Sequence, residues 1–149
     1  MKSQINFVVA NGRLTPTGSA SGALALAAWL GSDIQYSERT LEWWLSILAD
    51  VSSGARPPGY QGTGNTSSVT MTGEWVLVEN EFVADQKVLL NLQQANTVLG
   101  KYRLFLQSSP GASQQIPGPI PFEYEAEGAS AVGRYVELGG TLAAKPSGS

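Results

Sequence analysis

The sequence predicts an α+β fold, in which an antiparallel β-sheet of about four to six strands packs against two main α-helices and carries a C-terminal β extension. Two patterns predict it. Residues 69–92 alternate apolar and polar side chains around a turn at Gly73, as paired strands do. Residues 37–53 and 91–107 space apolar side chains three and four positions apart, which is the period of a helix.

The first 30 residues contain one clear hairpin and one ambiguous segment. Residues 5–10 are a predicted strand, and Asn11 and Gly12 form the strongest short hairpin signal. Pro16 predicts that the return strand is irregular or lies at a sheet edge. Residues 23–30 mix alanine and leucine, which favour a helix, but the leucines also alternate as in a strand. We slightly favour the strand.

The first predicted helix covers residues 37–53. Ser37 suits the N-cap, and Gly54 suits the position after the last turn. The predicted buried stripe consists of Leu41, Trp44, Leu45, Leu48 and Val51. Trp43 lies beside this stripe, either as part of the core or as a partly exposed anchor for a partner. Residues 54–68 are predicted to be a glycine-rich connecting loop, without the glycine spacing of a phosphate-binding loop.

The predicted sheet follows, and a second helix closes it. The strand after Gly73 has apolar residues on both faces, which predicts a central position. Asn91 can cap the second helix, and Gln94 can complete a capping box. The apolar stripe of this helix consists of Val98, Leu99, Tyr102, Phe105 and Leu106.

Four segments are expected along the chain. Residues 1–109 form the α+β domain, 110–121 a Pro/Gly-rich connector, 122–140 the C-terminal β extension and 141–149 a disordered tail. Within the extension, residues 122–126 and 134–138 alternate as two strands do. A lone hairpin is marginally stable in water, so the extension must lie against another surface. Packing on its own domain is favoured, and a homodimer formed through residues 122–138 is the alternative.

Composition excludes several classes of function. The chain has 149 residues, no histidine and no cysteine, so Ser-His and Cys-His catalytic pairs are excluded. Net charge is −3 and the nine lysines and arginines are scattered, so nucleic acid is not an expected partner. No apolar run reaches the ~20 residues of a membrane span. We expect a cytoplasmic protein with no signal peptide, cofactor or metal, and not an enzyme.

Carboxylates cluster at the end of the central strand. Glu79 and Glu81 lie two positions apart, and Asp85 follows. Paired carboxylates can serve acid–base catalysis or bind a metal, but a solvated strand end is the simpler interpretation. A second series of glutamates, at positions 123, 125 and 127, is also predicted to be solvated. The candidate partner-binding residues are Trp43, Glu74, Trp75, Glu79, Glu81 and Asp85.

The order of elements over residues 37–107 carries a family resemblance. Its pieces are a helix at 44–54, Gly64-Asn65, strands at 69–71, 76–81 and 90–92, a turn at Gly73-Glu74 and a helix end at 102–106. This pattern resembles small bacterial proteins of the YacL-like and toxin-immunity kind. The segments after Pro110 and near Leu26 depart from it.

The resemblance implies a small α+β protein that binds another protein, such as a toxin domain, and it implies no catalytic residues. The expected function is therefore immunity-like inhibition of a toxin domain by covering its surface. The alternative is a structural or assembly subunit of a phage or filament, which the glycine-rich, charge-poor composition favours. A third class is an enzyme or carbohydrate binder that uses Trp43 or Trp75.

Overall fold

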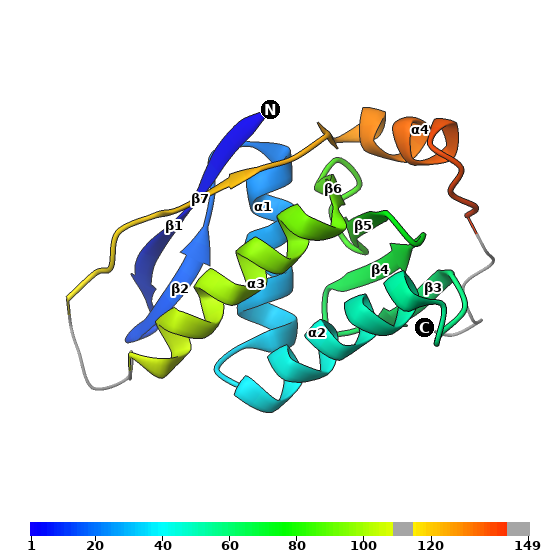
Figure 1. Cartoon of the computed structure of the whole chain (residues 1–149). Coiled ribbons are helices and arrows are strands. Elements are labelled where there is room, and N and C mark those ends of the chain that lie inside the picture. Colours follow the sequence, from blue (N-terminus) through cyan, green and yellow to red (C-terminus); the bar gives the residue numbers. More distant parts are fainter. Residues whose placement is uncertain (109–114, 143–149) are drawn as a thin grey trace.

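The computed structural model describes residues 1–108 and 115–142, which form two antiparallel sheets and four α-helices (Figure 1). This arrangement confirms the predicted α+β class. Residues 109–114, which include the first part of the predicted connector, and residues 143–149, which are most of the predicted tail, lie outside the described residues.

The smaller sheet has the strand order β2-β1-β7. It consists of β1 (Lys2–Ala10), β2 (Arg13–Thr17) and β7 (Ile120–Glu123). The predicted hairpin joins β1 to β2, and Asn11 and Gly12 have the positive φ values (53° and 75°) that a two-residue turn requires. The outer edge of β2 is blocked, because Pro16 has no N–H and the carbonyl of Leu14 accepts a hydrogen bond from the Tyr36 hydroxyl at 2.5 Å.

The larger sheet has the order β3-β4-β5-β6-β8. Its strands are β3 (Gly59–Thr63), β4 (Ser67–Met71), β5 (Trp75–Asn80), β6 (Lys87–Asn91) and β8 (Ala126–Glu127). The predicted strands are confirmed, and β5 is central as expected. The prediction of a loop over residues 54–68 is wrong at β3. This edge strand is built from Gly, Tyr, Gln and Thr with a register shift, so it lacks the apolar alternation that identifies strands.

The helices are α1 (Ser21–Ala28), α2 (Glu38–Ser53), α3 (Leu92–Gln107) and α4 (Ala129–Glu137), with a π-helical turn η1 (Trp29–Ile34) directly after α1. The strand favoured at residues 23–30 is therefore wrong. The buried residues of α1 are Gly22, Ala23, Ala25, Leu26 and Ala27. A helix buried on nearly every side shows no amphipathic stripe, and so its sequence resembles an alternating strand.

The predicted helix caps are confirmed. Ser37 Oγ accepts a hydrogen bond from the Thr40 N–H at 3.1 Å, and Gly54 has φ 84°. Asn91 and Gln94 form the predicted reciprocal capping box. In the stripe of α2 one residue differs, because Ile47 is buried where Leu45 is only partly buried.

The C-terminal segment packs on its own chain. Strand β7 pairs with β1, and β8 pairs with β6, so residues 120–127 cross from one sheet to the other (Figure 1). The predicted strand at 134–138 is wrong, because residues 129–137 form α4. Ala131 and Tyr135 lie one helical turn apart and pack against Leu77 and Leu89 of the larger sheet.

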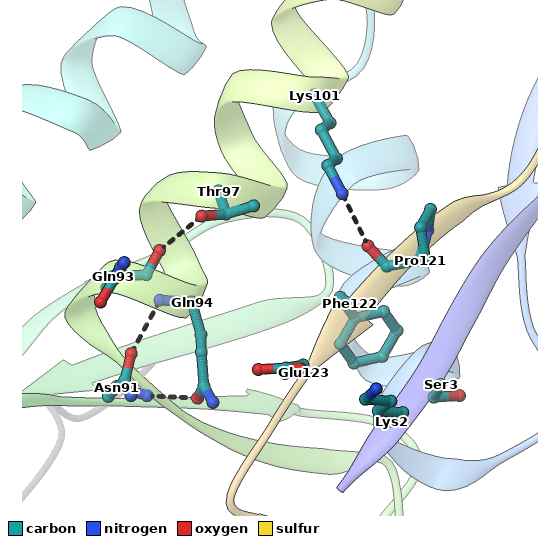
Figure 2. Close-up of a pocket in the computed structure, with 10 residues that line it drawn as sticks. All are labelled: Lys2, Ser3, Asn91, Gln93, Gln94, Thr97, Lys101, Pro121, Phe122 and Glu123. Atoms are coloured by element: carbon teal, nitrogen blue, oxygen red, sulfur yellow. Dashed lines mark hydrogen bonds between the residues drawn. The ribbon is translucent and has the colours of Figure 1, made fainter.

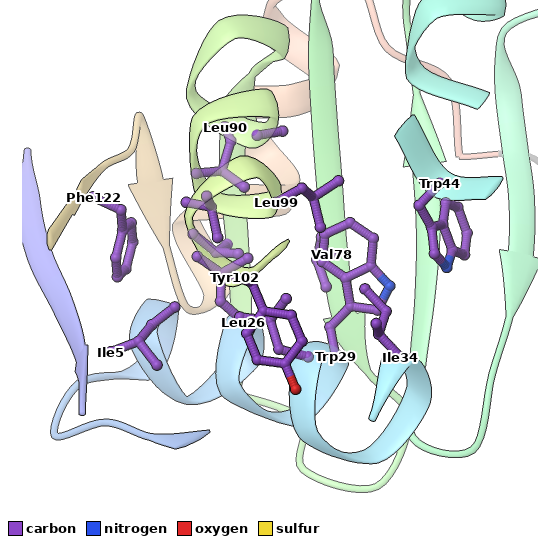
Figure 3. Close-up of a cluster of buried hydrophobic side chains, with 14 of the residues drawn as sticks. Ile5, Leu26, Trp29, Ile34, Trp44, Val78, Leu90, Leu99, Tyr102 and Phe122 are labelled. Atoms are coloured by element: carbon purple, nitrogen blue, oxygen red, sulfur yellow. The ribbon is translucent and has the colours of Figure 1, made fainter. Parts of the chain in front are cut away.

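The main core lies between the two sheets and helices α1, α2 and α3. Figure 3 shows Ile5 and Phe122 from the smaller sheet and Val78 and Leu90 from the larger one in the same cluster as Tyr102. Leu77 of β5 points instead to the α4 face, into a second cluster. Both faces of β5 are thus covered, as its apolar residues require.

Glu127, one of the glutamates predicted to be solvated, instead accepts hydrogen bonds that join two elements of the fold. Glu127 accepts hydrogen bonds from the Gly22 N–H at 2.7 Å and from the Tyr124 hydroxyl at 2.5 Å, which ties β8 to the start of α1. The hydrogen bond to Glu127, with a smaller effect of burial, raises the pKa of Tyr124 to about 12. Glu125 instead pairs with Arg134 at 3.0 Å on the surface.

Glu127→Ala should lower the free energy of unfolding by about 1.5–3 kcal/mol, because two donors lose a charged acceptor. Glu123→Ala is the matched control, since this glutamate is exposed and should cost within about 0.5 kcal/mol. Urea unfolding measures both. Equal losses would show that the Glu127 contacts contribute nothing. Because the folded-state pKa of Tyr124 is raised, the stability from this contact is complete below the unfolded pKa and is lost as pH rises toward about 12.

Candidate functional site

The structure distributes the predicted contact residues over three places. Trp43 lies on α2, is 46% exposed and packs edge-on against Trp44. Glu74 and Trp75 lie at the turn between β4 and β5. The remaining acidic residues lie at the far end of β5 and in the loop that follows. A strand of this length separates its two ends by about 17 Å, so the predicted set is not one site.

The loop between β5 and β6, residues 81–86, has a backbone held by the side chain of Asn80. We call it the acidic loop. Asn80 Oδ1 accepts hydrogen bonds from the N–H groups of Phe82 (2.8 Å) and Val83 (3.2 Å). Asn80 Nδ2 donates to Gln86 Oε1 at 2.9 Å, across the base of the loop. Such a side-chain-to-backbone turn orders the loop without any partner.

The ordered loop exposes an aromatic residue. Phe82 is 77% exposed, the highest value for a large apolar side chain in residues 1–108 and 115–142, and Val83 beside it is partly exposed. Sequence reasoning missed Phe82. The available signal was an aromatic residue placed between Asn80 and Asp85 in a short turn, where an apolar side chain has no core to enter.

The charges around Phe82 are negative. Glu81 and Asp85 are both exposed on the acidic loop. Glu79 differs from them, because its carboxylate pairs with Lys87 at 3.5 Å and its side chain is only 14% exposed on the α4 face. The loop therefore presents an apolar tip between two carboxylates, whereas Glu79 forms an ion pair within the larger sheet.

A groove of about 420 Å³ lies between α3 and β7, and Figure 2 shows the residues that line it. Its helix end is already capped by the Asn91–Gln94 box. Lys101 Nζ donates to the Pro121 carbonyl at 3.2 Å, and Thr97 Oγ1 donates to the Gln93 carbonyl at 2.9 Å. The Lys101 bond joins α3 to β7, whereas the Thr97 bond lies within α3 itself.

The carboxylate network around Asp33 is structural. Asp33 Oδ1 accepts hydrogen bonds from Thr66 N (2.8 Å) and Thr66 Oγ1 (3.0 Å), and Oδ2 accepts one from Ser67 N (3.0 Å). Burial raises the pKa of Asp33, and these hydrogen bonds oppose the rise. Within the described ranges, no group of three or more Asp and Glu side chains is placed to hold a metal ion.

Comparisons with models of protein families, with curated proteins and with solved structures give no match to this chain. Across the part of the chain that the structure describes, none of the helices has the length and apolar character needed to cross a membrane.

Proposed function

We propose that the protein is a small, non-catalytic binding protein that recognises another protein through the acidic loop. The observation that carries the proposal is Phe82, 77% exposed on a loop that Asn80 has already ordered. An aromatic side chain on an ordered loop loses little conformational entropy on binding, so it is the type of residue that dominates binding energy at interfaces.

The charges define the chemistry of the partner. Carboxylates at Glu81 and Asp85 flank Phe82, and the whole chain carries a net charge of −3. A complementary surface has an apolar pocket with lysines or arginines at its rim. A basic toxin domain, such as a nuclease, has this character, because it must itself bind phosphate.

In this proposal the protein is an immunity-like inhibitor in the cytoplasm, which blocks a toxin domain by covering its surface. The resemblance of residues 37–107 to small toxin-immunity proteins supports the proposal. Trp43, Glu74 and Trp75 lie away from the acidic loop and are left outside the proposed contact.

The test uses the product of the gene next to this one, with its C-terminal domain as the probe. We expect binding whose association rate falls steeply with salt, because charge complementarity accelerates encounter. The double variant Glu81→Lys with Asp85→Lys should slow association by about tenfold or more at low salt. Asp50→Lys, an exposed aspartate on α2, is the control and should have a much smaller effect. A neighbourhood of metabolic genes, or equal rates for both charge variants, would count against the proposal.

A further inference from the structure

A hollow of about 550 Å³ lies between the β1–β2 hairpin and the π-helical turn η1. Its volume is within the range of small-molecule sites, about 300–1,000 Å³. One wall is apolar and is formed by Leu14, Pro16 and the ring of Tyr36. The polar residues of the lining include Arg13, Gln35 and Asn65.

Gln35 has a strained backbone beside this hollow. It has φ 58° and ψ −133°, and the Ser37 N–H donates to the Ile34 carbonyl at 3.2 Å. These features describe a tight turn of type II′, whose first central position normally belongs to glycine. A residue with a side chain at this position costs on the order of 1–3 kcal/mol, and such strain concentrates at functional sites. A π-helical turn, another feature frequent at functional sites, ends immediately before it.

The side chain of Gln35 helps to form a set of hydrogen-bond donors. Gln35 Nε2 and Asn65 Nδ2 both donate to the carbonyl of Ser32, at 2.9 and 2.8 Å. An amide nitrogen carries two hydrogens, so each side chain keeps a second N–H after this bond. The two amide groups are thus anchored on the same carbonyl and retain donor capacity.

Arg13 adds a positive charge. Its guanidinium lies 5.4 Å from the centre of the Tyr36 ring, a cation–π contact that orients it over the hollow's aromatic wall. None of the described residues that line the hollow is acidic, although the chain as a whole is. Asp33 is near in sequence, but both of its oxygens are bound to Thr66 and Ser67.

We propose that this hollow binds a small aromatic carboxylate. The Arg13 guanidinium, with the amide N–H groups of Gln35 and Asn65, supplies donors for the carboxylate, and an arginine can bind both of its oxygens. The exposed ring of Tyr36, backed by the buried Leu14 and Pro16, supplies the surface for the ring of the ligand. The site is independent of the acidic loop and of the protein partner proposed there.

The test is a titration of the full ¹⁵N-labelled chain with benzoate, followed through backbone amide shifts. We expect saturable shifts at Gly31, Ser32, Gln35 and Asn65, with a dissociation constant in the millimolar range for so small a ligand. Benzamide, which has the same shape without the charge, should bind at least about tenfold more weakly. Shifts that do not saturate, or benzamide binding as tightly as benzoate, would overturn the proposal.

Two arginine variants test the donor set. Arg13→Gln should weaken benzoate binding by about tenfold or more, because the charged donor is lost. Arg39→Gln changes an exposed arginine of α2 that does not line the hollow, and it should leave the affinity unchanged. Equal affinities for these two variants would contradict the assignment of Arg13.

Gln35→Gly separates the binding role of Gln35 from a structural one. Glycine adopts a positive φ without strain, so this variant should have a melting temperature at or above that of the unchanged chain. Its affinity for benzoate should fall, because one anchored amide is lost. A lower melting temperature with unchanged affinity would show that Gln35 serves only the turn.

Discussion

Leu99→Ala should lower the free energy of unfolding by about 2–5 kcal/mol, one of the two largest effects expected in this chain. Leu99 is fully buried on α3, in the cluster that joins the two sheets. Its removal leaves a cavity that the surrounding strands and helices cannot fill. Leu104→Ala changes a leucine that is 67% exposed on the same helix, and it should cost within about 0.5 kcal/mol. Chemical denaturation of both variants measures the difference, and similar losses would mean that α3 faces the core with another side.

Asp33→Ala should cost about 2–4 kcal/mol, because it leaves the N–H groups of Thr66 and Ser67 without their acceptor next to a buried strand. Asp33 holds the turn before β4 against η1, and Gly64 packs so closely on it that a Cβ there would lie 2.5 Å from the carboxylate. Asp50→Ala is the control, because this aspartate is exposed on α2. Thermal unfolding of the two variants compares them. A small loss for Asp33→Ala would show that water replaces the carboxylate at no cost.

The local signals for hairpins, caps and central strands predicted much of the fold. Asn11 and Gly12 adopt the backbone that their hairpin signal requires, and the Asn91–Gln94 capping box forms as expected. These predictions are correct because each feature depends on residues that are close together in the chain. Gly54 ends α2 for the same reason.

The errors occur where packing between distant segments decides the structure. The alternation at residues 134–138 predicted a strand, but only Tyr135 is buried, whereas Val136 is half exposed on α4. Glu127 was predicted to be solvated because its donors, Gly22 and Tyr124, come together only in the folded chain. The prediction for α1 was wrong for the same reason, because the surroundings of this buried helix come from both sheets.

In the candidate sites, too, local sequence predicts some features, and contacts between distant segments decide the others. The carboxylates at Glu81 and Asp85 were recognised from their spacing, but the exposure of Phe82 depends on how Asn80 folds the loop back. The hollow beside Gln35 was not predicted, because it joins the β1–β2 hairpin to a turn and to Asn65. A sequence pattern does not show a surface formed by three separate segments.

In the proposed function, Phe82 anchors the protein partner. The most direct measurement is calorimetric titration of the C-terminal domain encoded by the adjacent gene with the unchanged chain and with Phe82→Ala. Because Phe82 is exposed, its removal should leave the melting temperature unchanged and should weaken binding by at least about 2 kcal/mol, or about thirtyfold. Leu104→Ala, the exposed apolar control on α3, should bind as the unchanged chain does. Equal affinity of Phe82→Ala and the unchanged chain, or no binding by either, would contradict the account.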